Sequence, residues 1–116
     1  MDIEQVRLHC LSKKSVTEGF PFGEETLVFK VEGKMFALIP LEKADRISLK
    51  CDPEYVVELR EKHEEITSAW HMNKKHWNTV ILTGNLPDTL VKHLVNHSYE
   101  RVVAKLPKSV RQKLKE

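Results

Sequence analysis

Apolar residues near the start of the chain recur with the period of a helix. Ile3, Val6 and Cys10 lie three or four positions apart, which predicts an amphipathic helix over residues 2–12. Residues 20–23 then read Phe-Pro-Phe-Gly, and this proline and glycine are typical of a turn or loop. We therefore expect the chain to open with one helix and then to leave helical structure.

The next two apolar runs favour strands. Residues 26–31 and 35–40 are rich in strand-forming side chains, and the dipeptide Glu32-Gly33 between them is typical of a tight turn. These two runs therefore predict a β-hairpin.

A third strand is indicated by alternation. Residues 46–50 alternate polar with apolar side chains, which is the pattern of a half-buried strand. Because successive side chains of a strand point to opposite faces, we expect Arg46, Ser48 and Lys50 to lie together on one face of the sheet.

A second helix and two further strands are expected after it. Asp52 is a good helix cap, and Pro53 at the first helical position loses no hydrogen bond, so a helix should run from there to about residue 63. Residues 67–70 favour a short strand, and residues 77–82 favour a longer one.

The last part of the chain is again helical. Apolar pairs recur every four residues from Leu90 onwards, after a start at residues 87–88. Ser98 is a possible cap, so the pattern allows either one long helix or two that meet near Asn96. Residues 108–115 predict a short, basic, exposed helix.

The expected order of elements is thus α-β-β-β-α-β-β-α, with a further short helix at the end. Helices that flank a run of antiparallel strands are typical of an α+β two-layer sandwich with one face of the sheet covered. The length of 116 residues and a hydrophobic content of 41% fit a single domain over residues 1–116. Neither a membrane-spanning run nor a signal-peptide pattern is visible, so we expect a cytoplasmic protein that does not contact the membrane.

Composition and motifs argue against an enzyme. The chain has four glycines and neither a phosphate-cradling glycine loop nor a nucleophile motif. Its two cysteines, Cys10 and Cys51, do not form a metal-binding or redox motif, and we expect them to be small buried hydrophobic residues. The sequence therefore predicts a non-enzymatic protein that requires no cofactor.

One pair of histidines allows a metal site on spacing alone. His93 and His97 lie at i and i+4 of the last helical region, and Glu100 follows on the same face if that helix is continuous. Histidines at the polar edge of an amphipathic helix show the same spacing without binding a metal. We therefore predict no metal site.

Positive charge is concentrated in the second half of the chain. Residues 1–65 carry 14 acidic and 10 basic side chains, a net charge of −4, whereas residues 66–116 carry 3 acidic and 9 basic ones, a net charge of +6. The sum is the +2 of the whole chain. Such asymmetry is found on surfaces that bind anions, although an ordinary solvated basic face gives it too.

The segment with the most specific chemistry is residues 71–77, His-Met-Asn-Lys-Lys-His-Trp, in a turn between two strands. Lysines can contact phosphates, amides and imidazoles can reach base edges, and the flanking rings of Trp70 and Trp77 can stack on bases. The alternative is that Trp77 packs inward and that the lysines are ordinary turn residues.

At this segment the chain resembles the MmcQ/YjbR family of small bacterial proteins. The resemblance rests on residues 71–80, on residues 84–88, which read Gly-Asn-Leu-Pro-Asp, and on Ser98-Tyr99, and it extends over essentially the whole chain. It implies the same α-β-β-β-α-β-β-α order, a double-wing arrangement similar to type III secretion chaperones. The family is largely uncharacterised; its usual label is DNA-binding protein, and it brings no catalytic residues.

The resemblance and the residue chemistry together give a hypothesis of DNA binding in an unknown process. Lys50, Lys74 and Lys75 would contact phosphates, and His71 and Asn73 would reach base edges. His76 and Arg46 complete the candidate DNA-binding set.

Two other classes of function remain open. A chaperone-like module would bind another protein, or a second copy of this chain, through the sheet face or the last helix. A small-molecule site around His71, His76 and Trp77 would need a concave pocket beside the turn.

Overall fold

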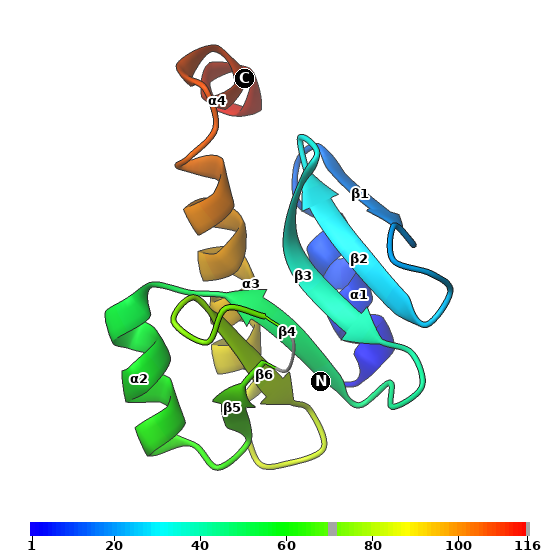
Figure 1. Cartoon of the computed structure of the whole chain (residues 1–116), viewed down its shortest axis with the longest axis vertical. Coiled ribbons are helices and arrows are strands. Elements are labelled where there is room, and N and C mark those ends of the chain that lie inside the picture. Colours follow the sequence, from blue (N-terminus) through cyan, green and yellow to red (C-terminus); the bar gives the residue numbers. More distant parts are fainter. Residues whose placement is uncertain (70–71, 116) are drawn as a thin grey trace.

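The computed structural model describes residues 1–69 and 72–115, which form helices and strands in the order αββββαββαα (Figure 1). The helices are α1 (Ile3–Leu11), α2 (Pro53–Lys62), α3 (Asp88–Val103) and α4 (Lys108–Lys115). The strands are β1 (Val16–Gly19), β2 (Thr26–Val31), β3 (Lys34–Pro40), β4 (Arg46–Lys50), β5 (Ile66–Ser68) and β6 (Trp77–Ile81).

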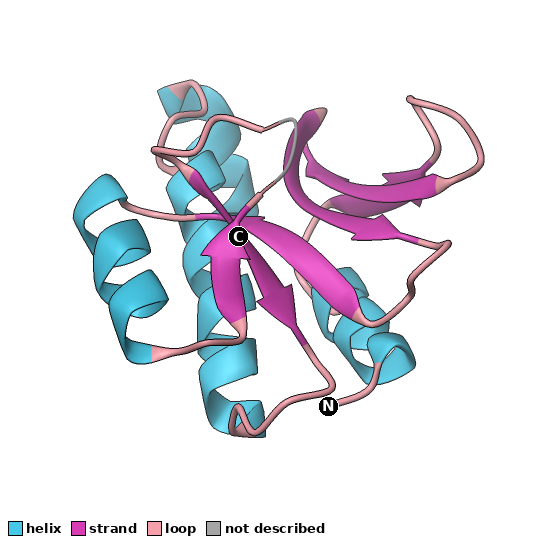
Figure 2. Cartoon of the chain, turned by 60° about the horizontal axis from the view of Figure 1, so that its bottom comes forward, coloured by secondary structure: helices cyan, strands magenta, loops and turns pink. Residues whose placement is uncertain are grey.

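All six strands belong to one antiparallel sheet in the order β1-β2-β3-β4-β6-β5. Helices α1, α2 and α3 pack against one face of this sheet, and α4 lies beyond the end of α3 (Figures 1 and 2). The predicted α+β two-layer class is confirmed. Strand β1 is an addition that the pattern did not predict, a four-residue edge strand in which Val16 pairs with Val31 of β2.

Local sequence explains the turns and caps that were predicted. Both Glu32 and Gly33 have positive φ, at 48° and 79°, as a two-residue hairpin turn of type I′ requires. The side chain of Asp52 accepts a hydrogen bond from the Glu54 N–H, and Pro53 begins α2. The predicted hairpin and the predicted helix start are therefore both confirmed.

The main core lies between the sheet and the helices. Phe29, Phe36 and Ile47 are fully buried there, together with Val56 of α2 and Val95 of α3. Both cysteines are free and buried, as predicted.

The opposite face of the sheet, which we call the open face, carries a smaller apolar cluster. Its buried members are Val28, Leu38, Ala69 and Trp77. The Trp77 side chain is therefore covered by its neighbours on this face and is not exposed to solvent. Strand β4 alternates between the two faces as predicted, with Ile47 and Leu49 in the main core and the polar residues directed to the open face.

Strands β3 and β4 pair only briefly, and α3 bridges them where they separate. The paired residues are Ala37 with Leu49 and Leu38 with Ser48. One step further on, the hydroxyl of Ser98 accepts a hydrogen bond from the Lys50 N–H (2.9 Å) and donates one to the Phe36 carbonyl (2.5 Å). The sheet therefore splits into two wings, β1–β3 and β4–β6, as Figure 2 shows.

Helix α3 is one continuous helix of 16 residues, which answers the question that the sequence left open. Ser98 lies inside it and is fully buried, so it bridges strands rather than capping a second helix. Of the helices within residues 1–69 and 72–115, none has the length and apolar content needed to cross a membrane.

Candidate functional site

Helix α2 fixes the loop that carries the candidate residues between β5 and β6. The guanidinium of Arg60 donates hydrogen bonds to Asn78 Oδ1 (2.7 Å), to the Lys74 carbonyl (2.5 Å) and to the Trp77 carbonyl (3.0 Å). The His76 carbonyl accepts from the N–H of Cys51, just after β4, at 2.8 Å. The described end of this loop is therefore held by both α2 and β4.

Within the loop, Asn73 is used to form the turn. Its Oδ1 accepts from the Lys75 N–H (2.9 Å), and its carbonyl accepts from the N–H groups of His76 and Trp77 (3.1 and 3.0 Å). An Asn that bonds to the backbone two residues later is typical of such turns. The exposed side chains of Lys74 and Lys75 are thereby presented on a fixed backbone.

Five basic residues from three separate segments come together beside this loop. We call Lys50, Lys75, His76, Arg101 and Lys105 the basic cluster. Partial burial, and then the charges of the other four members, lower the pKa of His76. Burial, followed by the charges of Lys105 and Arg101, also lowers the pKa of Lys50. Groups that disfavour each other's charged form in this way create a field that attracts anions.

Little negative charge offsets the cluster. Lys50, Lys75 and Lys105 form no ion pair with any residue in the described ranges, and Arg101 faces Asp52 at 3.8 Å. In the same part of the chain, His76 Nδ1 and Arg101 Nε are buried and make no hydrogen bond. The cluster therefore keeps the charge of its three unpaired lysines for an anionic ligand.

The structure thus divides the candidate residues that were predicted from sequence. Lys50, Lys75 and His76 belong to the basic cluster, and Lys74 and Asn73 lie beside it on the loop. Arg46 lies at the other end of β4 and is ion-paired with Asp45 at 2.7 Å. His71, and also Trp70, lie outside the described residues.

Arg101 and Lys105 were not among the predicted residues. Both lie at or just beyond the end of α3, far along the chain from the loop. The positive charge of residues 66–116 was the only sequence signal for them, and it does not select these two.

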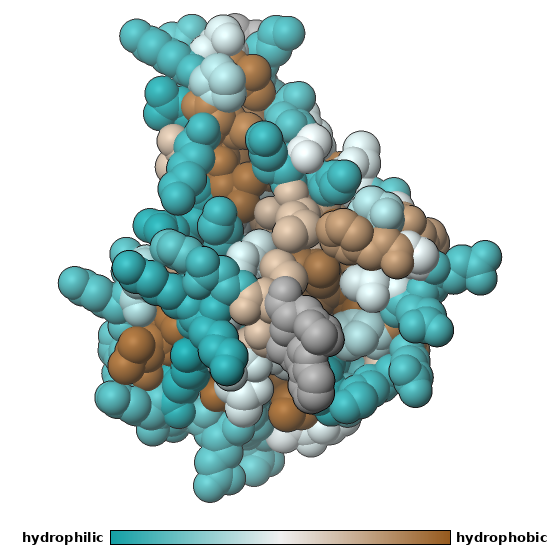
Figure 3. All heavy atoms as spheres, viewed as in Figure 1, coloured by the Kyte–Doolittle hydropathy of each residue, from teal (hydrophilic) through white to brown (hydrophobic). Residues whose placement is uncertain are grey.

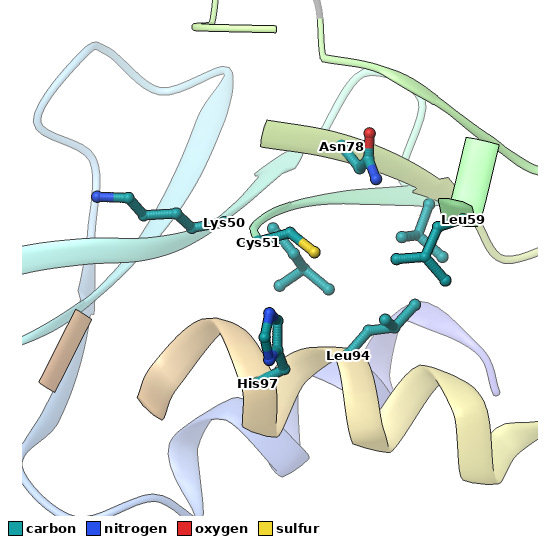
Figure 4. A pocket seen from close by; sticks show the side chains of 8 residues that line it. Lys50, Cys51, Leu59, Asn78, Leu94 and His97 are labelled. Atoms are coloured by element: carbon teal, nitrogen blue, oxygen red, sulfur yellow. The ribbon is translucent and has the colours of Figure 1, made fainter. Parts of the chain in front are cut away.

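Behind the cluster, on the helix side of the sheet, is a small cavity lined by Cys51, Asn78, Leu94 and His97 among others (Figure 4). Its volume of about 10 Å³ is enough for one water molecule but too small for a substrate. Burial raises the pKa of the Cys51 thiol to about 11, which keeps it protonated and unreactive at neutral pH.

The histidine pair of α3 serves packing. The rings of His93 and His97 are stacked with centroids 6.3 Å apart, and Tyr55 of α2 lies edge-on to His97 at 5.3 Å. His97 Nε2 accepts a hydrogen bond from the Asp52 N–H (3.1 Å). Within the described residues no group of three or more histidine, cysteine or carboxylate side chains could hold a metal ion.

Acidification is expected to destabilise the fold through His97. Burial, and then the charge of Arg101, lower the pKa of His97, so the folded protein favours the neutral ring. An unfolded chain takes up this proton near pH 6.5. His97 therefore has no effect well above pH 6.5, and the free energy of unfolding falls as the pH drops from about 6.5 through the lower pKa of the folded state.

Urea denaturation at pH 7.5 and 5.5 measures this effect, at pH values above the range where carboxylates titrate. In His97→Gln the amide oxygen can still accept from Asp52, but it does not titrate. We expect the free energy of unfolding of this variant to depend less on pH than that of the wild type. Part of the pH dependence should remain, because the pKa of His76 is also lowered in the folded protein. Equal pH dependence in both proteins would contradict the role of His97.

Comparison with known proteins gives a consistent match over nearly the whole chain. The YjbR family model matches residues 11–101. The uncharacterized protein YjbR of Escherichia coli K12 is 34% identical over 115 residues, which cover 98% of each chain. The uncharacterized protein YbdF of Escherichia coli O157:H7 is 38% identical over 90 residues, 77% of this chain and 74% of that protein.

A solved structure has the same fold. The crystal structure of Deinococcus radiodurans protein DR2400, described as a DUF419 domain, is 40% identical and superimposes with a TM-score of 0.90. The match covers 97% of this chain and 87% of that one. A Pseudomonas syringae protein is similar at 32% identity and a TM-score of 0.73, over 87% of this chain and 98% of that one.

Proposed function

The chain belongs to the YjbR family, and from this premise we propose that it is a non-enzymatic DNA-binding protein. The names of its relatives assign no activity, so the proposal rests on the geometry of this chain. The observation that carries it is the basic cluster of β4, the β5–β6 loop and α3, in which Lys50, Lys75 and Lys105 form no ion pair within the described residues and only Arg101 has a carboxylate there, Asp52 at 3.8 Å.

The cluster suits the DNA backbone better than a small anion. Phosphates along a strand are spaced ligands, and contacts from several separate lysines match them. Lys50, Lys75 and Lys105 would each bind a phosphate, and Arg101 would add hydrogen bonds from its planar group. Lys74 and Asn73, at the exposed tip of the loop, lie where a base edge or a neighbouring phosphate would pass.

Binding is expected to weaken steeply with salt. Four phosphate contacts predict a slope of roughly −3 to −4 in a plot of log affinity against log salt concentration. Fluorescence anisotropy of a labelled mixed-sequence duplex, titrated at a series of salt concentrations, measures this slope. We expect dissociation constants of about 10⁻⁴–10⁻⁶ M at physiological salt, as for non-specific binding.

Absence of binding at ~50 mM salt would reject the proposal. If the protein binds DNA but its affinity does not change with salt concentration, binding arises from apolar contacts and not from the basic cluster.

A protein-binding module is the second candidate, favoured by the exposure of large apolar side chains near β1. Phe20 and Phe22 are 50% and 67% exposed on one loop. Such residues often mark interaction sites. A stable dimer in sedimentation equilibrium, lost in the variant Phe20→Ala/Phe22→Ala, would support this function.

A further inference from the structure

The open face of the sheet carries a groove between the β1–β2 loop and β2. Its volume is about 260 Å³, and its lining includes Phe20, Pro21, Val28 and Lys30. Val28 belongs to the apolar cluster of this face, with Leu38 and Trp77. Figure 3 shows this face from the front, with apolar side chains gathered near its centre and hydrophilic ones around them.

Phe20 lines this groove, and Phe22, a second exposed phenyl ring, follows it on the same tight turn. The Gly23 N–H donates to the Phe20 carbonyl at 3.3 Å, and Gly23 has φ 108°, which only glycine adopts readily. Phe20 and Phe22 are therefore presented to solvent on a constrained backbone. Fixed, exposed rings are what stacking of nucleic-acid bases uses.

The charge around the groove favours an anionic occupant. The acidic residue in its lining, Glu18, is neutralised by Arg7 of α1 through two hydrogen bonds of 2.9 and 2.8 Å. Lys30 has no ion pair with a residue in the described part of the chain. Glu24 and Glu25 of the same loop are not part of the lining, so Lys30 is the charged lining residue that is left without an ion-pair partner among the described residues.

Lys50 of the basic cluster lies on the same side of the sheet as the groove. Lys50 is paired with Trp77, and Trp77 shares the open-face cluster with Val28 of the groove. A ligand that follows this face from the β1–β2 loop would therefore meet Phe20 first, with Lys30 beside it, and then Lys50 of the basic cluster.

We propose that the open face binds single-stranded DNA, with bases against Phe20 and Phe22 and the backbone along Lys30 towards the basic cluster. This inference rests on the proposed function and specifies its ligand. A duplex keeps its bases stacked inside and offers them no contact with exposed rings, whereas a single strand presents the face of every base. An apolar groove bordered by cations matches that combination of bases and phosphates.

The test compares oligo-dT of 20 nucleotides with a mixed-sequence duplex of 20 base pairs by fluorescence anisotropy at ~50 mM salt. We expect the single strand to bind the wild type more tightly. Phe20→Ala/Phe22→Ala should weaken single-strand binding about tenfold or more and leave duplex binding unchanged. Leu8→Ala is the matched control, because Leu8 is 56% exposed on α1, behind the sheet, and should change neither affinity.

The outcomes separate this inference from the proposed function. If the duplex binds as tightly as the single strand and the phenylalanine variant binds both normally, the single-strand inference is wrong and DNA binding stands. If neither DNA binds, both fail. Binding of an acidic, apolar peptide to the same face, lost in the phenylalanine variant and without DNA binding, would assign the groove to a protein partner.

Discussion

Reversing the charges of Lys50 and Lys105 together is expected to lower the affinity for DNA by about a hundredfold or more at ~50 mM salt. Each lost phosphate contact costs on the order of tenfold under these conditions, and a glutamate in its place repels the backbone. The variant Lys50→Glu/Lys105→Glu should also flatten the salt dependence by about two units of slope. Anisotropy titrations of both proteins over the same salt series measure both effects.

The same substitutions are expected not to destabilise the fold. Lys50 has a lowered pKa because it is partly buried and faces Lys105 and Arg101, so a carboxylate there relieves repulsion between like charges. Thermal unfolding should therefore show an equal or higher Tm. Loss of binding without loss of stability separates a direct contact from a folding defect.

The double variant Lys43→Glu/Lys92→Glu provides the matched control. Both lysines are exposed and lie outside the basic cluster, and the change in net charge is the same. If this control weakens DNA binding as much as the cluster variant does, binding follows the net charge of the protein and the proposed site is wrong.

The fold was largely predictable because most of its elements carry local signals. Alternation identified β4, the Glu32-Gly33 dipeptide identified the hairpin, and Asp52 with Pro53 identified the start of α2. Strand β1 has no comparable signal. Its four residues become a strand because they pair with β2 and because Glu18 is bound by Arg7 of α1.

Ser98 shows where local signals were insufficient. A serine within a helical pattern can be a cap or an internal residue, and only the strands that it meets decide between them. Its partners, Phe36 and Lys50, lie 62 and 48 positions away in the sequence. No window of the sequence around Ser98 contains that information.

The candidate site was half predictable for the same reason. Lys75 and His76 lie in one unusual segment, and Lys50 was placed on the correct face by alternation, but Arg101 and Lys105 join them only through the packing of α3 on the sheet. Arg46 was also predicted, but it lies at the other end of β4 and is ion-paired with Asp45. Its partner Asp45 is the preceding residue, so this ion pair could have been considered from the sequence.

Replacing Ser98 by alanine is expected to lower the free energy of unfolding by about 2–4 kcal/mol. The substitution removes both hydrogen bonds of the hydroxyl and leaves the Lys50 N–H and the Phe36 carbonyl without their partner where β3 and β4 separate. An unsatisfied buried group such as the Phe36 carbonyl costs about 1–3 kcal/mol, and the partly buried Lys50 N–H adds a smaller cost of about 1 kcal/mol. Urea denaturation measures the loss, and hydrogen exchange should show the Lys50 amide exchanging faster than in the wild type.

Ser48→Ala is the matched control for this substitution. Among the described residues its hydroxyl bonds to the Thr79 hydroxyl alone, across β4 and β6 on the open face, at 3.1 Å. We expect the loss of this partly exposed bond to cost about 1 kcal/mol or less. If Ser98→Ala is no more destabilising than Ser48→Ala, the Lys50 N–H of β4 and the Phe36 carbonyl of β3 find other partners when the Ser98 hydroxyl is absent. The split between the wings, with the position of Lys50 beside α3, would then not depend on Ser98.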